Sequence, residues 1–568
     1  MVRRVLPILL LRLRTPLVAL VAVYAVTILG FVLIPGENNA GEPWRMDFFH
    51  AFYFVSYMGS TIGFGEIPYP FTPAQRLWAT VSIYATVFTW LYTIGSLLAH
   101  LQDPALRRMV QESSFRRDVR RLAEPFYVVC GYGDTGSALV RGLDERGLQS
   151  VVVDIDGERR DELATDPLTR NVPGLAGDAA DPRALELAGL SEPQCQGVLA
   201  VTNDDRANLA VCVSARVLRS GLMTVGRAER GETEENMRSF GTDHVVNPFE
   251  TFADRFTTAL RSPGMYLLYE WLATTDEDRL AEPVLPPAGT WVIAGYGRFG
   301  RAVARYLEFH GQPYRAIDPE PPAAEAETMV VGRGTEAVTL RAADIESAVG
   351  IVAATDDDAD NLSIIMTARE LNPGLFTIAR QTQRRNDELF AAAELDMVMQ
   401  PGTIMASRIL SLVTTPLLTD FLRHARHQEA DWANLLVSRL AGLLPEGEAP
   451  EVWGVRLDEY DAPAIIGWLG EGSEIALGTL LRDPREASRG LWALPLLRQR
   501  ADGSEELLPD PETPLAAGDR LLFAGRHGIR ARQRWILDNR NVLAYLLRGR
   551  AMPESHLWRR LGGRFTGP

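Results

Sequence analysis

The sequence has few cysteines, few histidines and no excess of positive charge. Its three cysteines, Cys130, Cys195 and Cys212, show neither the spacing of metal ligands nor the density of a disulfide framework. We therefore expect buried free thiols in a reducing cytosol. The formal net charge of −15 argues against a nucleic-acid partner, because phosphate binding requires a basic face. The eight histidines are scattered, and His424 and His427 share a helix face without an evident metal partner.

Long apolar runs are also scarce, and only two are long enough for a membrane span. Residues 16–34 and 77–101 contain no Asp, Glu, Lys or Arg, and both reach the ~20 residues that a helix needs to cross ~30 Å of hydrocarbon. The first run is too long for the core of a simple signal peptide, and no small-residue cleavage site follows it. No arginine-rich voltage-sensor helix is present, so voltage is not the obvious gate.

Basic residues flank the two runs on their outer sides, while the connecting segment begins with Glu37 and Glu42. The positive-inside rule therefore predicts a multi-pass protein with both termini in the cytoplasm, and we expect it in a bacterial inner membrane among membrane lipid. The flanking arginines are Arg3, Arg4, Arg12, Arg14, Arg107, Arg108, Arg116, Arg117, Arg120 and Arg121.

Between the runs, residues 48–61 are apolar but too short to span, which suits a re-entrant helix whose C-terminal dipole favours a cation. Residues 61–65 follow it directly and read T-I-G-F-G. Alone, this pentapeptide is also compatible with a glycine-rich turn. Its place between two spans, with both termini on one side, favours a pore.

Residues 60–66 resemble the potassium-channel selectivity filter, which is usually written T-V-G-Y-G-D. In that family backbone carbonyls replace the hydration shell of K⁺, and the resemblance implies that four chains close one filter. Relative to the pattern, Ile62 and Phe64 are mild changes, although Phe64 lacks a hydroxyl that helps to prop the filter, and Glu66 lengthens an acidic arm. The implied filter residues are Thr61, Ile62, Gly63, Phe64 and Gly65. Gly95, the only glycine in the second run, is either a gating hinge or a close-packing site.

The remainder of the chain contains an internal duplication. Residues 126–136 read F-Y-V-V-C-G-Y-G-D-T-G and residues 291–300 read W-V-I-A-G-Y-G-R-F-G. Each copy has a strand, a G-x-G-x-x-G turn, a helix pattern and a second strand ending on an acid, Asp154 or Asp318. These features predict two doubly wound α/β domains with parallel sheets, in which the glycines approach a pyrophosphate and the acid meets a ribose. A tight strand–helix turn also uses glycine for packing alone.

The two copies differ in length and in local charge. The offset between equivalent residues falls from 164 at the glycines to 153 at Asn208 and Asn361, so the second copy lacks 11 residues after its second strand. Where the first copy has Asp178, the second has Arg333. The second pocket is therefore expected to take another ligand, a more anionic one, or none.

Residues 120–410 resemble tandem RCK domains, the Trk/Ktr-type nucleotide-binding domains that regulate potassium conductance. The resemblance implies NAD or an adenine nucleotide (ADP or ATP) as the regulatory ligand. In the first copy it implies contacts from Gly131, Gly133, Asp134, Thr135, Gly136, Asp154, Asp178, Thr202, Asn203 and Asp204, with Arg227 meeting either phosphate or an internal salt bridge. In the second copy it implies contacts from Gly295, Gly297, Arg298, Phe299, Gly300 and Asp318.

A third cytoplasmic part, residues 451–530, shows short strands and polar turns, and residues 509–523 resemble the C-terminal lobe of RCK proteins with its Gly-Asp turn. Any β-hairpin is the simpler interpretation. The fold class is thus an α-helical pore domain followed by tandem Rossmann-like domains and a small α+β lobe. The expected divisions are 1–105 pore, 106–124 linker, 125–262 first N-lobe, 263–288 connector, 289–415 second N-lobe, 416–450 helical connector, 451–530 C-lobe and 531–568 helix and tail.

These features predict a homotetrameric, ligand-gated potassium channel subunit with eight RCK units in a cytoplasmic ring. An oxidoreductase is a second class, but no catalytic set accompanies the glycine turns, so we expect no enzyme. A pore-less regulatory subunit of a potassium transporter is a third, and the filter-like segment argues against it. Ca²⁺ or another divalent ion is a further candidate ligand, because acidic clusters occur at residues 274–278 and 356–358.

Overall fold

The structure is a computed structural model that describes residues 14–102, 104–273, 285–323, 325–445 and 447–549. The chain divides into two compact units, one made of residues 1–123 with 187–189 and the other of the remaining residues. The expected basic residues before Arg14 and the acidic cluster at 274–278 lie outside the described residues.

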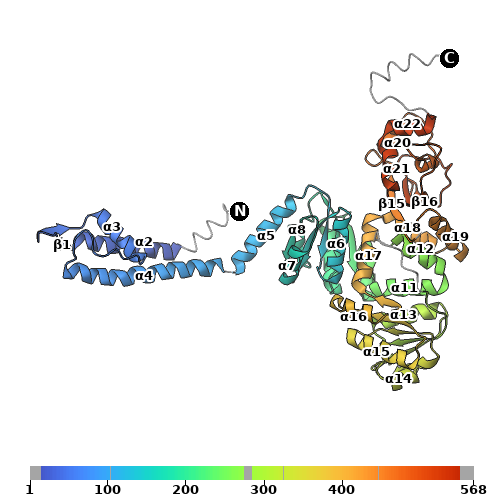
Figure 1. The fold of residues 1–568 in the computed structure, drawn as a ribbon, viewed down its shortest axis with the longest axis horizontal. Helices are drawn as coiled ribbons and strands as arrows, with labels where there is room; N and C mark the ends of the chain where they lie inside the picture. The colour runs from blue at the N-terminus through green and yellow to red at the C-terminus, as the bar shows by residue number, and fades with distance from the viewer. Residues whose placement is uncertain (1–13, 103, 274–284, 324, 446, 550–568) are drawn as a thin grey trace, which may run out of the picture. The chain divides into compact units, whose positions relative to one another are not determined.

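Three helices and a small hairpin make up the membrane part of the first unit (Figure 1). Helices α2 (Arg14–Leu33) and α4 (Pro73–Leu101) are the two expected runs, and the stretches Arg14–Leu33 and Pro73–Ala99 are long and apolar enough to cross a membrane. Between them lie strands β1 (Pro35–Glu37) and β2 (Pro43–Arg45) and helix α3 (Phe48–Gly59), which covers most of the expected re-entrant segment. Helix α5 (Pro104–Arg120) follows.

Helices α2 and α4 pack through one small and one large residue. A side chain at Gly30 would come within 2.1 Å of the Trp78 ring, so the indole occupies the space that glycine leaves. The Trp78 Nε1 donates to the Thr27 carbonyl at 3.1 Å, and the Trp90 Nε1 donates to the Tyr24 hydroxyl at 2.9 Å. The indole N–H groups are thus satisfied inside the helix pair, as an apolar environment requires.

The second unit contains two six-stranded parallel sheets, as the duplication predicts (Figure 1). Their strand orders, β5-β4-β3-β6-β7-β8 and β11-β10-β9-β12-β13-β14, are the same order of equivalent strands. The first sheet contains β3 (Phe126–Cys130), β4 (Gln149–Asp154), β5 (Gly174–Ala176), β6 (Cys195–Ala200), β7 (Met223–Arg227) and β8 (His244–Val246). The second contains β9 (Trp291–Ala294), β10 (Tyr314–Asp318), β11 (Val330–Val331), β12 (Gly350–Ala353), β13 (Phe376–Arg380) and β14 (Met397–Met399). In both, the strand order reverses beside the glycine turn, where this fold binds ligands.

Helices cover the sheets in matching positions. The first copy has α6 (Asp134–Glu145), α7 (Gly157–Thr165), α8 (Pro182–Leu187), α9 (Asp205–Leu218), α10 (Gly231–Ser239) and α11 (Pro248–Arg261). The second has α13 (Arg298–Phe309), α14 (Ala337–Ala342), α15 (Asp358–Leu371), α16 (Asp387–Ala392) and α17 (Pro401–Thr414). Within the described residues, no helix joins β10 to β11, so the length that the second copy lacks corresponds to α7.

The copies exchange their last helices. Helix α11 of the first copy packs its Phe252 and Phe256 onto Phe299 and Trp291 of the second. Helix α17 of the second copy packs on α6 of the first, where Leu410 fills the space above Gly142. The exchange makes the two copies one packed body, a feature that the duplication alone does not predict.

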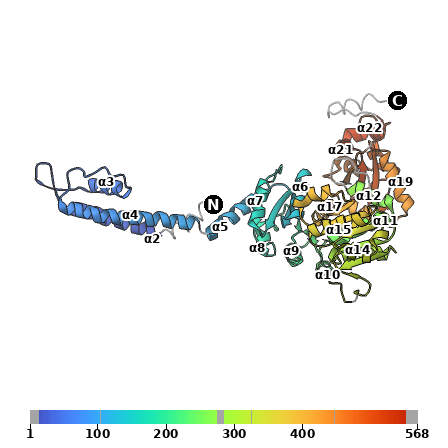
Figure 2. The same cartoon turned by 60° about the horizontal axis from the view of Figure 1, so that its bottom comes forward.

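A helical layer and a small α+β lobe follow. The layer consists of α12 (Pro263–Ala273), α18 (Pro416–Ala425) and α19 (Ala430–Ala441), which bury a leucine-rich cluster. The lobe has an antiparallel sheet of order β15-β18-β16-β17 and helices that lie together beside it (Figure 1, Figure 2). Its elements are β15 (Glu451–Arg456), α20 (Pro463–Gly470), β16 (Ala493–Gln499), β17 (Glu505–Leu507), β18 (Arg520–Gly525), α21 (Ile529–Asp538) and α22 (Arg540–Arg548).

The expected Gly-Asp turn stands directly before β18. Gly518 has φ +86°, and Asp519 is buried and accepts bonds from the Arg498 guanidinium at 2.7 and 2.9 Å. This buried ion pair ties the turn to β16 and gives the glycine and the acid separate roles.

Candidate functional site

The predicted pore loop begins with a capped helix. The Asp47 carboxylate accepts a hydrogen bond from the backbone N–H of His50 at 2.8 Å and so caps α3. Helix α3 ends at Gly59, and the predicted filter residues follow at once. Its C-terminal carbonyls therefore lie beside the first filter residue, Thr61.

The backbone of residues 61–65 has a positive φ at every second residue. Thr61, Gly63 and Gly65 have φ of +63°, +66° and +99°, values that residues with a Cβ rarely adopt. Ile62 and Phe64, which lie between them, are exposed on this single chain. An alternating backbone directs successive carbonyls differently from a regular strand, which explains why two of the five residues are glycines.

Side chains of neighbouring elements hold the segment at its C-terminal end. The Tyr57 hydroxyl of α3 donates to the Gly65 carbonyl, and the Tyr57 and Phe64 rings lie 5.4 Å apart. The Glu66 carboxylate accepts bonds from the Arg76 guanidinium at 2.8 Å and from the Phe71 N–H at 2.8 Å. These contacts support the segment even though Phe64 lacks the hydroxyl found in the family pattern.

Gly95 of α4 has no close neighbour within the described chain, since a Cβ built there would meet nothing within 4 Å. Packing inside one chain therefore does not account for this glycine. A hinge and a contact between chains both remain predictions.

The three glycines of the first turn have different roles. Gly131 has φ +102°, and a Cβ at Gly136 would lie 1.9 Å from the Gly131 carbonyl oxygen, so both positions are fixed by the fold. A Cβ at Gly133 would meet nothing within 4 Å. Gly133 thus opens onto free space at the N-terminus of α6, where a phosphate is favoured.

The second turn repeats this geometry. Gly295 has φ +99°, a Cβ at Gly300 would lie 2.0 Å from the Gly295 carbonyl oxygen, and Gly297 again has open space. Phe299 is buried in the core below the turn, where it packs on α11.

The acids at the ends of the second strands hold the turns in place. Asp154 accepts hydrogen bonds from the Tyr132 and Asp156 N–H groups, and Asp318 accepts the equivalent bonds from Tyr296 at 2.6 Å and Glu320 at 2.9 Å. Each carboxylate keeps further acceptor positions for a ribose diol, because it has about four. The predicted Asp178 is exposed, and its carboxylate accepts the Ala180 N–H at 2.8 Å.

A buried asparagine fixes the loop that carries three of the predicted contact residues, Thr202, Asn203 and Asp204. The Asn208 side chain bonds the Thr202 N–H, hydroxyl and carbonyl and the Arg227 carbonyl, and Asp204 caps α9 through the Arg206 N–H at 2.8 Å. Asn361 makes the same four bonds in the second copy. The asparagine that follows each acidic loop is therefore a structural residue.

A cavity of about 240 Å³ joins the first turn to the second copy. It brings together five of the predicted residues, Asp134, Thr135, Asn203, Arg227 and Arg298, with Arg380 and Arg384. Buried Arg227 donates to the Asn203 side chain at 2.8 Å and to the Thr135 hydroxyl at 3.4 Å, and it pairs with Glu229. Arg227 therefore forms the internal salt bridge and also borders the cavity.

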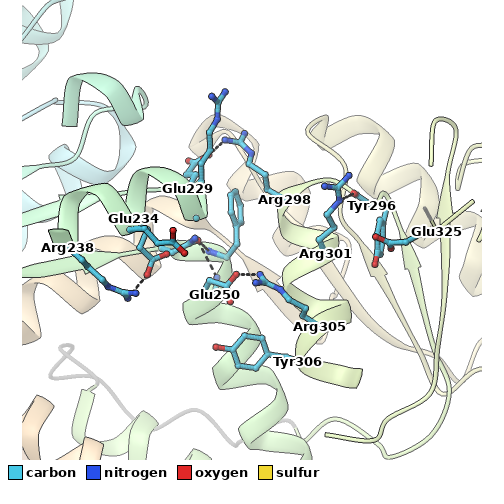
Figure 3. A pocket seen from close by; sticks show the side chains of 15 residues that line it. Glu229, Glu234, Arg238, Glu250, Tyr296, Arg298, Arg301, Arg305, Tyr306 and Glu325 are labelled. Atoms are coloured by element: carbon cyan, nitrogen blue, oxygen red, sulfur yellow. Dashed lines mark hydrogen bonds and ion pairs between the residues drawn. The ribbon is translucent and has the colours of Figure 1, made fainter. Parts of the chain in front are cut away.

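Glu229 connects the two copies. Its carboxylate pairs with Arg227 of the first copy and with Arg298, the first residue of the helix after the second glycine turn. Figure 3 shows Arg298 reaching Glu229 and Arg305 reaching Glu250. Arg301 of the same helix lies beside Tyr296. The sequence signal for Glu229 is weak, because a charged residue two places after a strand has many possible roles.

The other acids and thiols have plain structural explanations. Asp356 pairs with Arg380, Asp357 caps α15, and Asp358 accepts bonds from the Thr382 and Gln383 N–H groups. Across the described ranges, no group of three His, Cys, Asp or Glu residues has a metal-binding arrangement. His424 pairs with Glu505. The expectation of buried free cysteines is confirmed for Cys130, Cys195 and Cys212.

Two family models match parts of the chain. An ion channel family model matches residues 17–103, and the TrkA-N domain model matches twice, at residues 127–248 and 291–401.

Curated relatives include potassium channels and potassium uptake proteins. Potassium channel protein 1 of Methanocaldococcus jannaschii is 26% identical over 238 residues, which cover 42% of this chain and 69% of that protein. The voltage-gated potassium channel Kch of Escherichia coli is 23% identical over 35% of this chain and 46% of that one. The Trk system potassium uptake protein TrkA of Mycobacterium tuberculosis is 26% identical over 41% of this chain and 90% of that one.

Among solved structures, the GsuK channel aligns over 93% of this chain and 98% of its own, at 19% identity and a TM-score of 0.46. The GsuK channel bound to NAD covers 95% and 100%, at 19% identity and a TM-score of 0.44.

Proposed function

We propose that this chain, which carries an ion channel domain and two TrkA-N domains and is homologous to potassium channel proteins, forms a potassium-selective pore gated by a nucleotide. It is a membrane protein of the channel type and not an enzyme. The observation that carries the pore is the alternating backbone of residues 61–65, placed at the end of a short apolar helix between two spans. Thr61, Ile62, Gly63, Phe64 and Gly65 are the proposed filter.

Four chains would close such a filter, because each contributes one loop. The exposed side chains of Ile62 and Phe64 support this proposal, because apolar side chains next to a pore loop need to be buried by neighbouring chains. A tetramer would bring eight TrkA-N domains into one cytoplasmic ring. The proposed orientation, with both termini cytoplasmic in a bacterial inner membrane, follows from the flanking arginines.

The proposed nucleotide site is the first glycine turn. Gly133 leaves open space at the N-terminus of α6, and Asp154 retains acceptor positions for a ribose. NAD, ADP or ATP would place phosphate at this helix end. Gating then requires that the nucleotide bind two shapes of the ring with different affinity.

The second turn is proposed mainly to hold the two copies together through an ion pair, and not to bind a nucleotide itself. Its glycine geometry is the same, but Arg298 is engaged with Glu229. A second nucleotide at Gly295, Gly297, Gly300 and Asp318 is the alternative, and it would have to share the entrance with this ion pair.

A regulatory divalent cation has less support. The carboxylates of Asp356, Asp357 and Asp358 already pair with a guanidinium, cap a helix or accept backbone bonds. A cation there would have to displace these partners, so Ca²⁺ stays a secondary proposal.

Single-channel recording from the purified full-length protein tests both parts. Potassium and sodium face each other across a planar bilayer, and NAD or ADP is added on the cytoplasmic side. A potassium-selective current whose open probability changes with nucleotide is expected. A selective current indifferent to nucleotide would contradict the gate but keep the pore. Silence of a well-folded oligomer under every ligand would favour the transporter-subunit alternative.

A further inference from the structure

A further polar cavity, of about 400 Å³, lies within the second unit, and its lining includes no residue of either glycine turn. Helices α11, α17 and α18 form most of its wall, together with side chains from α10, α12 and α13. Helices α17 and α18 meet there at a bend of 108°. On α17, the residues Ile404, Ser407, Arg408 and Ser411 share one face, because their spacing follows the helical period.

The charges that line this cavity do not balance. Four of its five arginines pair with a carboxylate: Arg238 with Glu234, Arg255 with Glu270, Arg423 with Asp420 and Arg426 with Asp254. Arg408 has no hydrogen bond or ion pair within the described part of the chain. Asp254 acts on Arg408 from a distance, but it is committed to Arg426 at 2.6 Å. A partly buried guanidinium therefore lines the cavity without an ion-pair partner among the described residues.

Two residues that line the cavity, Ser411 and Thr419, carry buried hydroxyls without partners. Ser411 is only 8% exposed, and neither its Oγ nor the Thr419 Oγ1 has a hydrogen-bond partner among the described residues. A buried hydroxyl without a partner costs about 1–3 kcal/mol, so such groups are rare in native proteins. Because both residues line the cavity, rotation of either side chain toward a bound acceptor would give its hydroxyl a partner.

We propose that this cavity is a binding site for a small phosphate-bearing anion, held by the Arg408 guanidinium and by the hydroxyls of Ser411 and Thr419. Arginine suits this ligand because its planar fork of donors matches phosphate oxygens. The volume exceeds that of phosphate alone and lies within the range of small-molecule pockets. Because α11 and α17 are the helices exchanged between the copies, an anion here would bind to the joint between them.

Isothermal titration of the full-length protein in detergent tests the site, with inorganic phosphate and glycerol 3-phosphate as probes and chloride of equal ionic strength as the reference. The background is the double variant G133A/G297A, which places a methyl group in the open space of both glycine turns. We expect saturable phosphate binding in this background and at least about tenfold weaker binding when R408Q is added, the equivalent of one charge-assisted hydrogen bond.

Two further variants separate binding from folding. S411A removes an unpartnered buried hydroxyl, so it should not lower the melting temperature measured without phosphate, whereas it should weaken phosphate binding several-fold. R439Q makes the same charge change at an exposed arginine of α19 and should alter nothing.

The two probes identify the source of the anion. A glycerol 3-phosphate affinity about tenfold above that of phosphate assigns the cavity to a phosphorylated metabolite, and equal affinities assign it to free phosphate. The proposal would be overturned if phosphate did not bind in the G133A/G297A background. It would also be overturned if adding R408Q or S411A left the phosphate affinity equal to that of this background. Water would then be the occupant of the cavity.

Discussion

At the scale of single residues, the glycines of the first turn separate ligand binding from folding. G133A adds a methyl group that touches no protein atom within 4 Å, whereas the methyl of G136A would lie 1.9 Å from the Gly131 carbonyl oxygen. We expect G133A to keep the free energy of unfolding within about 0.5 kcal/mol of the wild type and to weaken nucleotide binding about tenfold or more. G136A should instead cost about 3 kcal/mol through overpacking.

Titration of ADP or NAD into each variant, beside chemical denaturation, measures both quantities. G297A is the matched control in the second copy, where the geometry is the same. Full nucleotide affinity in G133A together with a loss in G297A would move the site to the second turn.

The buried cysteines give a second prediction at this scale. Burial raises the pKa of Cys195 to about 11 and that of Cys212 to about 12, and burial also raises the pKa of Cys130. Since the thiolate is the reactive form, about one Cys195 in a thousand is ionised at pH 8. We expect a thiol reagent to modify none of the three at a measurable rate in the folded protein and all three in guanidinium. Rapid reaction of any cysteine in native protein would contradict the buried placement.

At the scale of elements, the exchanged helices should carry much of the stability of the second unit. Leu410 on α17 is 4% exposed and packs over Gly142 of α6. L410A leaves a cavity there, and we expect a loss of about 2–5 kcal/mol. L435A, at a leucine that is 62% exposed on α19, should change the free energy of unfolding by less than about 0.5 kcal/mol.

Hydrogen exchange shows both where in the fold L410A lowers stability and by how much. Faster exchange in L410A should appear in both α6 and α17, because each covers the other. Exchange that rises in α17 alone would mean that the two helices do not protect one another.

The packing of α11 and α17 on the opposite copies could not be predicted from the sequence. The strands, glycine turns and terminal acids were predictable, because they are local patterns that occur twice at matching offsets. The partner of α17 was not, because an amphipathic helix shows which face is buried and not which element buries it. Glu229 and Ser411 were missed for the same reason: each acquires its role from residues that are distant in the chain.

At the scale of the whole molecule, Glu229 offers a test of communication between the copies. Its carboxylate is about 10% exposed and pairs with both Arg227 and Arg298. E229Q leaves buried Arg227 without its carboxylate partner, so we expect a loss of about 3 kcal/mol in stability. We also expect nucleotide to bind but to change open probability less, because the two turns are no longer tied by an ion pair.

The control for E229Q is E235Q, which changes the same charge at an exposed position of α10. Single-channel recording with and without ADP compares the variants. An unchanged nucleotide response in E229Q would show that the ion pair holds the copies together without transmitting anything between them.

The proposed tetramer gives a further prediction at this scale. One defective loop is enough to disable a filter that four identical loops build together. Gly65 has φ +99°, so G65V strains the backbone in the proposed filter and should give non-conducting subunits. When wild-type and G65V chains are co-expressed in equal amounts and mix at random, only about one tetramer in sixteen lacks the variant. We therefore expect the potassium current per channel protein to fall about sixteenfold, against a twofold fall if each chain conducted alone and a fourfold fall for a dimer. G41V is the matched control: Gly41 also has a positive φ of +79°, but it lies in the loop between β1 and β2, so dilution with G41V should leave the current unchanged.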